Sequence, residues 1–287
     1  MCTRGPGVVR QMSWEKWEYG TFQYGHYKPK IYEEPEVMEN DHFLWKYLKP
    51  EEIETAVEVL RGYCSDERLQ RLEGVLGART ENVRMVYENP ANANNVWAAL
   101  RTLDSFGVQY VDCVMDPIKY KKGWRRNTMV SAMGAQKWLS LTQHENTASC
   151  LDELRGQGYR IIAADLTETS KPIEEIDWNE GKVAVFMGNE LTGISDELRA
   201  AACETFYIPT KGFAESLNVS VAAAVLCTLL EQKGTLKADL CEDEKPKILL
   251  TWLARTVPGS LAILRREGYK VKGNSLYQPM GKFTTKP

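Results

Sequence analysis

The chain has 287 residues, of which 43% are hydrophobic and 26% charged, and its formal net charge is −3. This composition is typical of a globular protein with one large domain or two small ones. The sequence contains no run of about 18 uninterrupted apolar residues, so we expect no membrane-spanning helix. The first ten residues contain no apolar core, and we therefore expect no secretory signal.

The cysteines and histidines indicate neither a disulfide framework nor a metal site. The seven cysteines are widely spaced and form no C-x-x-C pair, and the three histidines share no ligand spacing. An odd number of scattered cysteines is typical of free thiols in a reducing compartment. We therefore expect an intracellular protein, cytoplasmic or organellar, that holds no metal ion.

Residues 1–48 are rich in Trp, Tyr, Glu and Pro. This arm is too aromatic for a typical disordered tail, so we expect it to dock on a partner or on the protein's own dimer. A helical segment is predicted at 49–80, because apolar residues recur there at helical spacing. They form two sets, which are Ile53, Ala56, Val57 and Leu60, and then Leu69, Leu72, Val75 and Leu76.

Strands and helices then alternate along the chain. Strands are predicted at 83–88, 108–114, 159–165, 182–188 and 205–209. Helices are predicted at 95–105, 148–157, 195–202 and 216–231. This alternation predicts an α/β domain at 81–234, with a mostly parallel sheet covered on both faces. Two further helices, at 246–256 and 258–268, are predicted within a basic C-terminal extension at 235–287.

The charge is unevenly distributed, because no acidic residue occurs between Pro117 and His144. This stretch contains the basic residues Lys119, Lys121, Lys122, Arg125, Arg126 and Lys137, with Tyr120, Trp124 and Trp138 among them. Basic residues interleaved with aromatic ones suit phosphate contacts and base stacking, which predicts RNA binding. A solvated loop would have the same composition. The basic stretch at 255–287 is a second candidate RNA contact, although an exposed helix face would look the same.

Three clusters contain polar residues that packing of the hydrophobic core does not explain. The first is NANNVWAALR at 92–101, in which Asn92 and Asn95 precede a helix that contains Arg101. Asparagines at a helix start are often only caps, and a helix arginine often only covers apolar surface. The second is FMGNELTGIS at 186–195, where an apolar strand runs into a loop with two glycines. Such loops form ligand crevices in open α/β sheets, but they also form plain strand-to-helix turns.

The third cluster is IPTKGFAESLNVSVAAAVLCTLL at 208–230. A helix at 216–231 would be apolar nearly all round, so it must be covered on more than one side. We expect one face to pack on the sheet and another on a second subunit. The polar residues Glu215, Ser216 and Asn218 lie at the start of this helix, which is unusual for a core helix.

The order and spacing of the three clusters resemble a known family. The series N-x-x-N-x5-R, M-G-N-E-x-x-G-I-S and I-P-x-x-G-x-x-E-S-L-N-V-S is similar to the signature motifs of the SpoU/TrmH family. These are SPOUT-class RNA ribose 2′-O-methyltransferases that use S-adenosylmethionine, and the TrmH branch, which methylates guanosine 18 of tRNA, is the most similar. The resemblance extends over about residues 50–270.

The resemblance implies a Rossmann-like SPOUT fold with a deep trefoil knot on the C-terminal side, and a homodimer with active sites at the interface. It places the cofactor against four positions, which are Ala164, Gly188, Ile208 and Leu217. It assigns the catalytic role to Arg101, with conserved polar residues around it, which are Asn95, Glu190, Ser216 and Asn218. Arg101 would act as the general base or would orient the hydroxyl and neutralise a phosphate, since a guanidinium is a poor base.

One departure affects Asn92, because the motif that usually reads N-P-h-N is N-A-N-N here. Two other functions stay open. One is an rRNA 2′-O-methyltransferase. The other is a catalytically silent RNA-binding or ribosome-assembly factor with the same fold, for which the aromatic arm would be a docking surface. The retained Arg101, Glu190, Ser216 and Asn218 argue against a silent protein.

Overall fold

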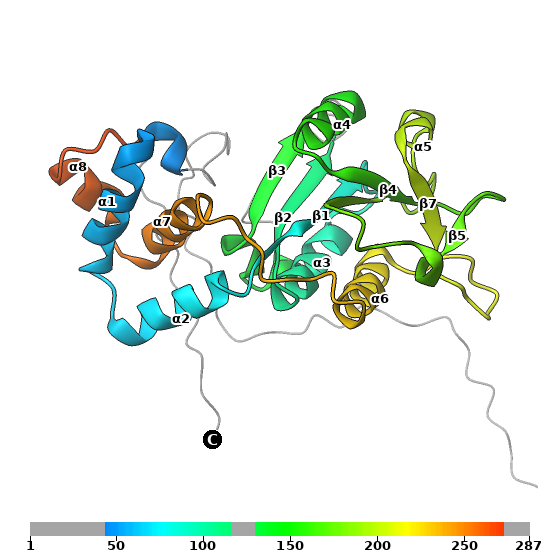
Figure 1. The fold of residues 1–287 in the computed structure, drawn as a ribbon, viewed down its shortest axis with the longest axis horizontal. Coiled ribbons are helices and arrows are strands. Elements are labelled where there is room, and N and C mark those ends of the chain that lie inside the picture. Colours follow the sequence, from blue (N-terminus) through cyan, green and yellow to red (C-terminus); the bar gives the residue numbers. More distant parts are fainter. Residues whose placement is uncertain (1–43, 116–129, 273–287) are drawn as a thin grey trace, which may run out of the picture. The chain divides into compact units, whose positions relative to one another are not determined.

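The fold is given by a computed structural model, which describes residues 44–115 and 130–272. Seven strands form one sheet in the order β3-β2-β1-β6-β4-β7-β5 (Figure 1). Their bounds are β1 Thr80–Glu88, β2 Val108–Val114, β3 Ser140–His144, β4 Arg160–Ala164, β5 Lys171–Pro172, β6 Val183–Met187 and β7 Glu204–Tyr207. Every pairing between these strands is parallel. The predicted α/β class with a mostly parallel sheet is therefore confirmed.

The strand order changes direction at β1. The chain passes from β1 to β2 and β3 on one side, and the later strands β6, β4, β7 and β5 lie on the other. In register, Tyr87 of β1 lies opposite Met187 of β6, so the two strands end nearly level. Ligands of open α/β sheets bind at the carboxyl ends of the strands where the order reverses. The loops that follow β1 and β6 therefore occupy the expected position of a site.

Helices cover both faces of the sheet (Figure 1). Helices α3 (Ala93–Ser105) and α6 (Val219–Gln232) pack on each other and on one face. Helices α4 (Thr147–Gly156) and α5 (Asp196–Ala201) pack on the other face. A sheet covered on both sides needs strands that are apolar on both sides, which is the pattern of β6.

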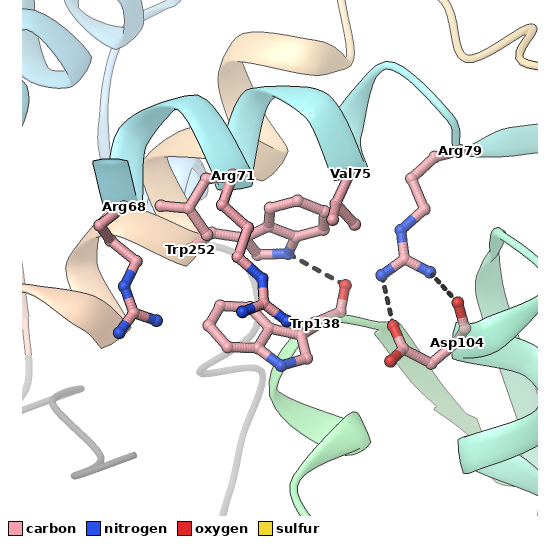
Figure 2. Close-up of a pocket in the computed structure, with 8 residues that line it drawn as sticks. Arg68, Arg71, Val75, Arg79, Asp104, Trp138 and Trp252 are labelled. Carbon is pink, nitrogen blue, oxygen red and sulfur yellow. Dashed lines mark hydrogen bonds and ion pairs between the residues drawn. The ribbon is translucent and has the colours of Figure 1, made fainter. Parts of the chain in front are cut away.

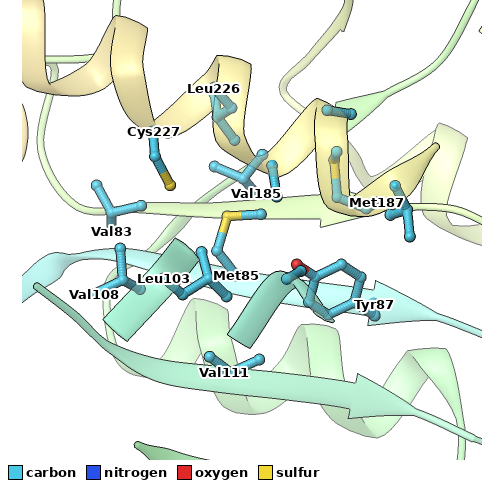
Figure 3. Packing of buried hydrophobic residues seen from close by; sticks show 14 of the residues in the cluster. Val83, Met85, Tyr87, Leu103, Val108, Val111, Val185, Met187, Leu226 and Cys227 are labelled. Carbon is cyan, nitrogen blue, oxygen red and sulfur yellow. The ribbon is translucent and has the colours of Figure 1, made fainter. Parts of the chain in front are cut away.

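The main core lies between the sheet and the pair α3 and α6. Figure 3 shows Met85 of β1 and Val185 of β6 beneath Leu226 and Cys227 of α6. Side chains alternate along a strand, so Val86 of β1 points to the opposite face, where it joins the smaller core under α4 and α5. The central strand is thus anchored on both sides, which fixes the position of the loop that follows it.

Four further helices have a core of their own and are called the helical cluster below. They are α1 (Pro50–Arg61), α2 (Asp66–Leu76), α7 (Lys245–Thr256) and α8 (Ser260–Arg266). The predicted face of α1 is buried as expected, since Ile53, Ala56, Val57 and Leu60 are at most 6% exposed. Short 3-10 helices occur at η1 Leu44–Tyr47, η3 Val130–Ala132, η4 Ala135–Lys137 and η5 Ile173–Glu175.

Among the described residues, no single helix has the length and apolar composition of a membrane span. The helices α7 and α8 reach that composition only together, as a pair bent by 113°.

The predicted elements differ from the structure at several places, and one of them is β1, which was predicted at 83–88 but begins at Thr80. The helix predicted at 216–231 begins only at Val219, because the side chain of Asn218 caps it by accepting a hydrogen bond from the backbone N–H of Ser220. The short strands β3 and β5 were not predicted. β3 reads SLTQH and is mostly polar, and β5 has only two residues, so neither shows a clear period.

Candidate active site

Glu190 joins the loop after β6 to the loop after β1. One carboxylate oxygen accepts a hydrogen bond from Nδ2 of Asn95 at 2.9 Å, and the other accepts from the backbone N–H of Ala91 at 2.7 Å. Two of the predicted site residues, Asn95 and Glu190, are therefore brought together although 95 positions separate them. The carboxylate of Glu190 thus links the start of α3 and the loop before it to the loop after β6.

Residues 188–195, called the β6 loop below, close on themselves. Asn189 and Gly193 exchange backbone hydrogen bonds, both of 2.9 Å. The side-chain oxygen of Asn189 also accepts from the N–H groups of Leu191 and Thr192, at 2.8 and 3.1 Å. Gly193 has φ +70°, a conformation that glycine adopts without strain.

Gly188 is a glycine because the β6 loop folds back over it. A Cβ at this position would lie 2.6 Å from the carbonyl carbon of Gly193 and 2.7 Å from the nitrogen of Ile194. Both are backbone atoms, so neither could move aside without a shift of the loop. The family resemblance places the cofactor against Gly188. The structure shows that the chain itself already requires a glycine here.

Glu88 and Asn89, at the end of β1, hold the β6 loop through hydrogen bonds. Glu88 is 2% exposed, and its carboxylate accepts from the N–H and the Oγ of Ser195, at 2.8 and 2.6 Å, and from Oγ1 of Thr147, at 2.6 Å. Asn189 donates its side-chain amide to the carbonyl of Asn89, at 2.6 Å. The sequence analysis did not single out Glu88. An acid at the end of the apolar strand VRMVYE was the signal that could have identified it.

Ala164 and Ile208 lie at neighbouring strand ends. Ala164 is the last residue of β4 and pairs in register with Phe206 of β7, and Ile208 follows β7 directly. Both are half-buried against the main core. In the sheet, β4 lies between β6 and β7. The predicted cofactor positions at the carboxyl ends of these strands are therefore neighbours, in the order Gly188, Ala164 and Ile208.

Residues 209–218, called the β7 segment below, contrast with the β6 loop because every one of them is exposed. A hydrogen bond of 3.1 Å from Oγ1 of Thr210 to the carbonyl of Ala214 spans its middle. Asn218 caps α6, with its side-chain oxygen accepting from the N–H of Ser220 at 2.9 Å and from its Oγ at 2.7 Å. Leu217, the fourth predicted cofactor position, is 38% exposed, and Ser216 is exposed beside it.

Arg101 is exposed on α3 and is not brought to Asn95. It lies six residues further along the helix, which is about 9 Å along the axis. Within the ranges 44–115 and 130–272, no hydrogen bond or ion pair joins its guanidinium to Glu190, Ser216 or Asn218. One chain therefore assembles the Asn95–Glu190 pair but leaves the other polar residues of the site apart.

The predicted polar residues of all three clusters fall within the range matched by a protein-family profile. The profile of the SpoU rRNA methylase family covers residues 82–228, just over half of the chain. The chain belongs to the SpoU rRNA methylase family. The match runs from β1 into α6, whereas the helical cluster lies outside it.

Several RNA methyltransferases are similar in sequence to this chain. The tRNA (guanosine(18)-2'-O)-methyltransferase of Borreliella burgdorferi is 33% identical over 204 residues, which is 70% of this chain and 91% of that protein. The enzyme of that name from Escherichia coli strain K12 is 34% identical over 55% of this chain and 67% of its own length. A 23S rRNA (guanosine-2'-O-)-methyltransferase, RlmB of Acinetobacter baylyi, is 29% identical over 54% of this chain and 61% of that protein.

A solved structure of a SpoU-family relative has the same fold. The crystal structure of the Aquifex aeolicus TrmH/SpoU tRNA modifying enzyme superposes with a TM-score of 0.58 at 32% identity, and it covers 66% of this chain and 95% of that one. The predicted resemblance to the SpoU/TrmH family is therefore confirmed.

The predicted RNA-binding residues lie mostly outside the described part of the chain. These are Lys119, Lys121, Lys122, Arg125 and Arg126. Lys137 ends η4 and is half-buried, and its carbonyl accepts a hydrogen bond from Arg255 of α7. This basic stretch therefore remains a prediction in the SpoU-family chain.

No group of residues suited to a metal ion or a thiolate nucleophile occurs at the site, as far as the structure describes the chain. Among residues 44–115 and 130–272, no three His, Cys, Asp or Glu side chains converge as metal ligands. Burial raises the pKa of Cys227 in α6 to about 12, and burial also raises the pKa of Cys113 in β2 well above its ordinary value. These cysteines are therefore neutral thiols that pack in the core.

Proposed function

We propose that the chain is an S-adenosylmethionine-dependent methyltransferase that modifies the ribose 2′-hydroxyl of RNA, with guanosine 18 of tRNA as its target. The observation that carries this proposal is the hydrogen bond between Asn95 and Glu190, which joins two of the polar clusters at the reversal of the strand order. Family membership supports it, and so do relatives of 33% and 34% identity that are named tRNA (guanosine(18)-2'-O)-methyltransferases.

The edge formed by β6, β4 and β7 fits the cofactor. Neighbouring strands are about 4.8 Å apart, so Gly188, Ala164 and Ile208 lie in a row at the strand ends. All three are half-buried, and their backbone would contact the cofactor. Leu217 would cover it from the β7 segment. When bound, S-adenosylmethionine supplies a methyl group on a sulfonium sulfur.

The chain's polar residues would orient the RNA. The Asn95–Glu190 pair fixes the start of α3, and Arg101 lies exposed two turns further on. A guanidinium stays protonated in proteins, so we assign Arg101 to hold a phosphate and orient the 2′-hydroxyl. The alternative, a general base activated by a phosphate, gives the same prediction for its removal. Ser216 and Asn218 would face the ribose from the β7 segment.

A second copy of the chain would complete the site. Val221 and Val225 lie one turn apart on α6 and are 48% and 37% exposed, and Leu217, just before the helix, is 38% exposed. These exposed apolar side chains and the separation of Arg101 from Glu190 in one chain support a homodimer. Light scattering of wild type and of Val221→Glu tests it. A wild-type monomer with full activity would contradict the two-chain site.

Three further features belong to the proposal. We infer that residues 208–230 form the last threaded segment of a deep trefoil knot, which the family resemblance supports. An experimental structure in which this segment is not threaded would contradict the inference. We retain 49–80, 81–234 and 235–287 as domain boundaries. The first and the last share the core of the helical cluster, which supports their division from 81–234. The arm at 1–48 would dock on a partner or on the dimer, and the protein would work in the cytoplasm or an organelle. Deletion of the arm tests docking on the dimer, because it should then lower the fraction of dimer measured by light scattering.

Methyl transfer from labelled S-adenosylmethionine tests the function directly. The full chain is incubated with a tRNA transcript, the same transcript with guanosine 18 replaced by adenosine, and 23S rRNA. We expect label on the first transcript alone. Label on rRNA alone would favour the rRNA methyltransferase, which the relative from Acinetobacter baylyi supports as a second candidate. No label on any RNA would favour a silent RNA-binding factor.

Substitution of Arg101 locates the reaction centre. We expect Arg101→Ala to lower the transfer rate at least about 100-fold, because no other described residue replaces its charge, while S-adenosylmethionine binding stays within twofold. Arg155→Ala is the matched control, since Arg155 is also exposed on a helix but lies on α4, on the opposite face. Near-normal turnover of Arg101→Ala would refute the assignment.

A further inference from the structure

A small basic and aromatic pocket lies between the helical cluster and the sheet domain, apart from the loops of the active site (Figure 2). Its volume is about 130 Å³, whereas pockets for drug-sized ligands have about 300–1,000 Å³. It is therefore too small for S-adenosylmethionine, and its size suits one planar ring. Its walls are Arg68, Arg71, Leu72 and Val75 of α2, Arg79, Asp104 of α3, Trp138, and Trp252 of α7.

The charge of the pocket favours an anion. Its lining contains three arginines, Arg68, Arg71 and Arg79, and one acid, Asp104, which forms an ion pair with Arg79. Arg68 and Arg71 are three residues apart on α2, and Figure 2 shows both projecting toward the side of Trp138. Two guanidinium groups that line the same side of the pocket provide planar donors of the kind that bind a phosphate group.

The aromatic wall is rigid before any ligand arrives. The rings of Trp138 and Trp252 meet edge to face, 5.8 Å apart at 83°. The carbonyl of Trp138 accepts from Nε1 of Trp252 at 3.0 Å and from Nε2 of Gln109 at 3.1 Å. Trp252 is 2% exposed and also lies under the guanidinium of Arg79, whereas Trp138 is only half-buried. A fixed, accessible indole next to arginines lowers the entropic cost of stacking a ring on it.

We propose that this pocket binds one unpaired nucleotide of the RNA substrate, with its base on Trp138 and its phosphate at Arg68 and Arg71. The inference rests on the proposed function, and it adds a binding site for a nucleotide other than the methylated one. Asp104 lies one helical turn after Arg101 on α3, which is about 4.5 Å along the axis. The pocket therefore lies beside the path of an RNA strand that reaches Arg101.

Binding of the full chain to a tRNA transcript tests the pocket. Trp138→Leu keeps apolar volume but removes most of the stacking surface, and we expect it to weaken tRNA binding about tenfold. Trp138→Phe, which keeps an aromatic face, should recover most of the affinity. The double variant Arg68→Gln/Arg71→Gln should also weaken binding about tenfold and should reduce the slope of log K against log salt by about 1 to 2. Trp138→Leu should leave that slope unchanged.

The controls separate this inference from the proposed function. Arg155→Gln removes an exposed charge on the opposite face and should bind tRNA as the wild type does. S-adenosylmethionine affinity reports that each variant is folded. If the pocket variants bind tRNA within twofold of wild type while the wild type methylates it, the pocket inference is wrong and the function stands. If binding depends on the pocket but no methyl transfer occurs, the function fails and the pocket stands. A wild type that binds no RNA overturns both.

Discussion

The β6 loop and the β7 segment both carry characteristic motifs of the family, yet the structure treats them differently. The β6 loop is tied to itself through Asn189 and Gly193, and to β1 through Glu88 and Asn89. The β7 segment is exposed at all ten positions, and its described hydrogen bonds run within the segment or to the start of α6. The first is preorganised by the chain, whereas the second has surface available for a cofactor, RNA or a second subunit. Four substitutions test this contrast.

The largest effect is expected at the glycines. Gly188→Ala would place a Cβ against the backbone of Gly193, so we expect a loss of about 3 kcal/mol in the free energy of unfolding. Gly212→Ala in the β7 segment is the matched control, because its added Cβ would have 4.0 Å to the nearest atom, the nitrogen of Ala214. We expect a change within about 0.5 kcal/mol there. Urea denaturation measures both, and equal effects would remove the contrast.

The next largest effect is expected at Glu88. Glu88→Gln replaces an oxygen that accepts from Ser195 or Thr147 by a donor, and one buried donor is left unsatisfied. We expect about 2 kcal/mol of destabilisation. Because the β6 loop would loosen, the KM for S-adenosylmethionine should also rise. Glu215→Gln, an exposed glutamate of the β7 segment, serves as the control in the same denaturation series. An unchanged urea midpoint for Glu88→Gln would show that the hydrogen bonds from Ser195 and Thr147 to Glu88 are dispensable for stability.

A smaller effect is expected at the end of the β7 segment. Asn218→Ala removes the cap of α6, which accepts from Ser220, and should cost about 1 kcal/mol. Asn218→Asp keeps the cap and should recover the stability, as thermal unfolding would show. If Asn218 also faces the ribose, Asn218→Asp will restore stability without restoring methyl transfer. Full recovery of both would limit Asn218 to capping.

The smallest effect on stability is expected at Ser216. Its side chain is exposed and holds no described part of the fold, so Ser216→Ala should change the free energy of unfolding by less than about 0.5 kcal/mol. Methyl transfer should nevertheless fall, because we place its hydroxyl at the ribose. Single-turnover kinetics at saturating S-adenosylmethionine measures this, and an unchanged rate would exclude Ser216 from the site.

Much of the fold was predictable because its signals are local. β2 was predicted at its observed bounds, and Ser195 accepts the hydrogen bond from Leu198 that an N-cap requires. The strands β3 and β5 were missed because they are short and lack an apolar pattern, and their structure depends on pairing with β2 and β7. The helix predicted at 216–231 begins before α6 does, because the apolar pattern does not show that Asn218 is the cap.

The sequence by itself determined the family, the α/β class and the residues of the polar clusters, since spacing and periodicity are properties of the chain alone. Only the tertiary structure decided which of them meet. Asn95 and Glu190 are joined because parallel pairing brings the ends of β1 and β6 level, whereas Arg101 remains apart on the surface of α3. The role of Glu88 and the pocket at Trp138 also depend on contacts between segments far apart in the chain, and no local pattern encodes such contacts.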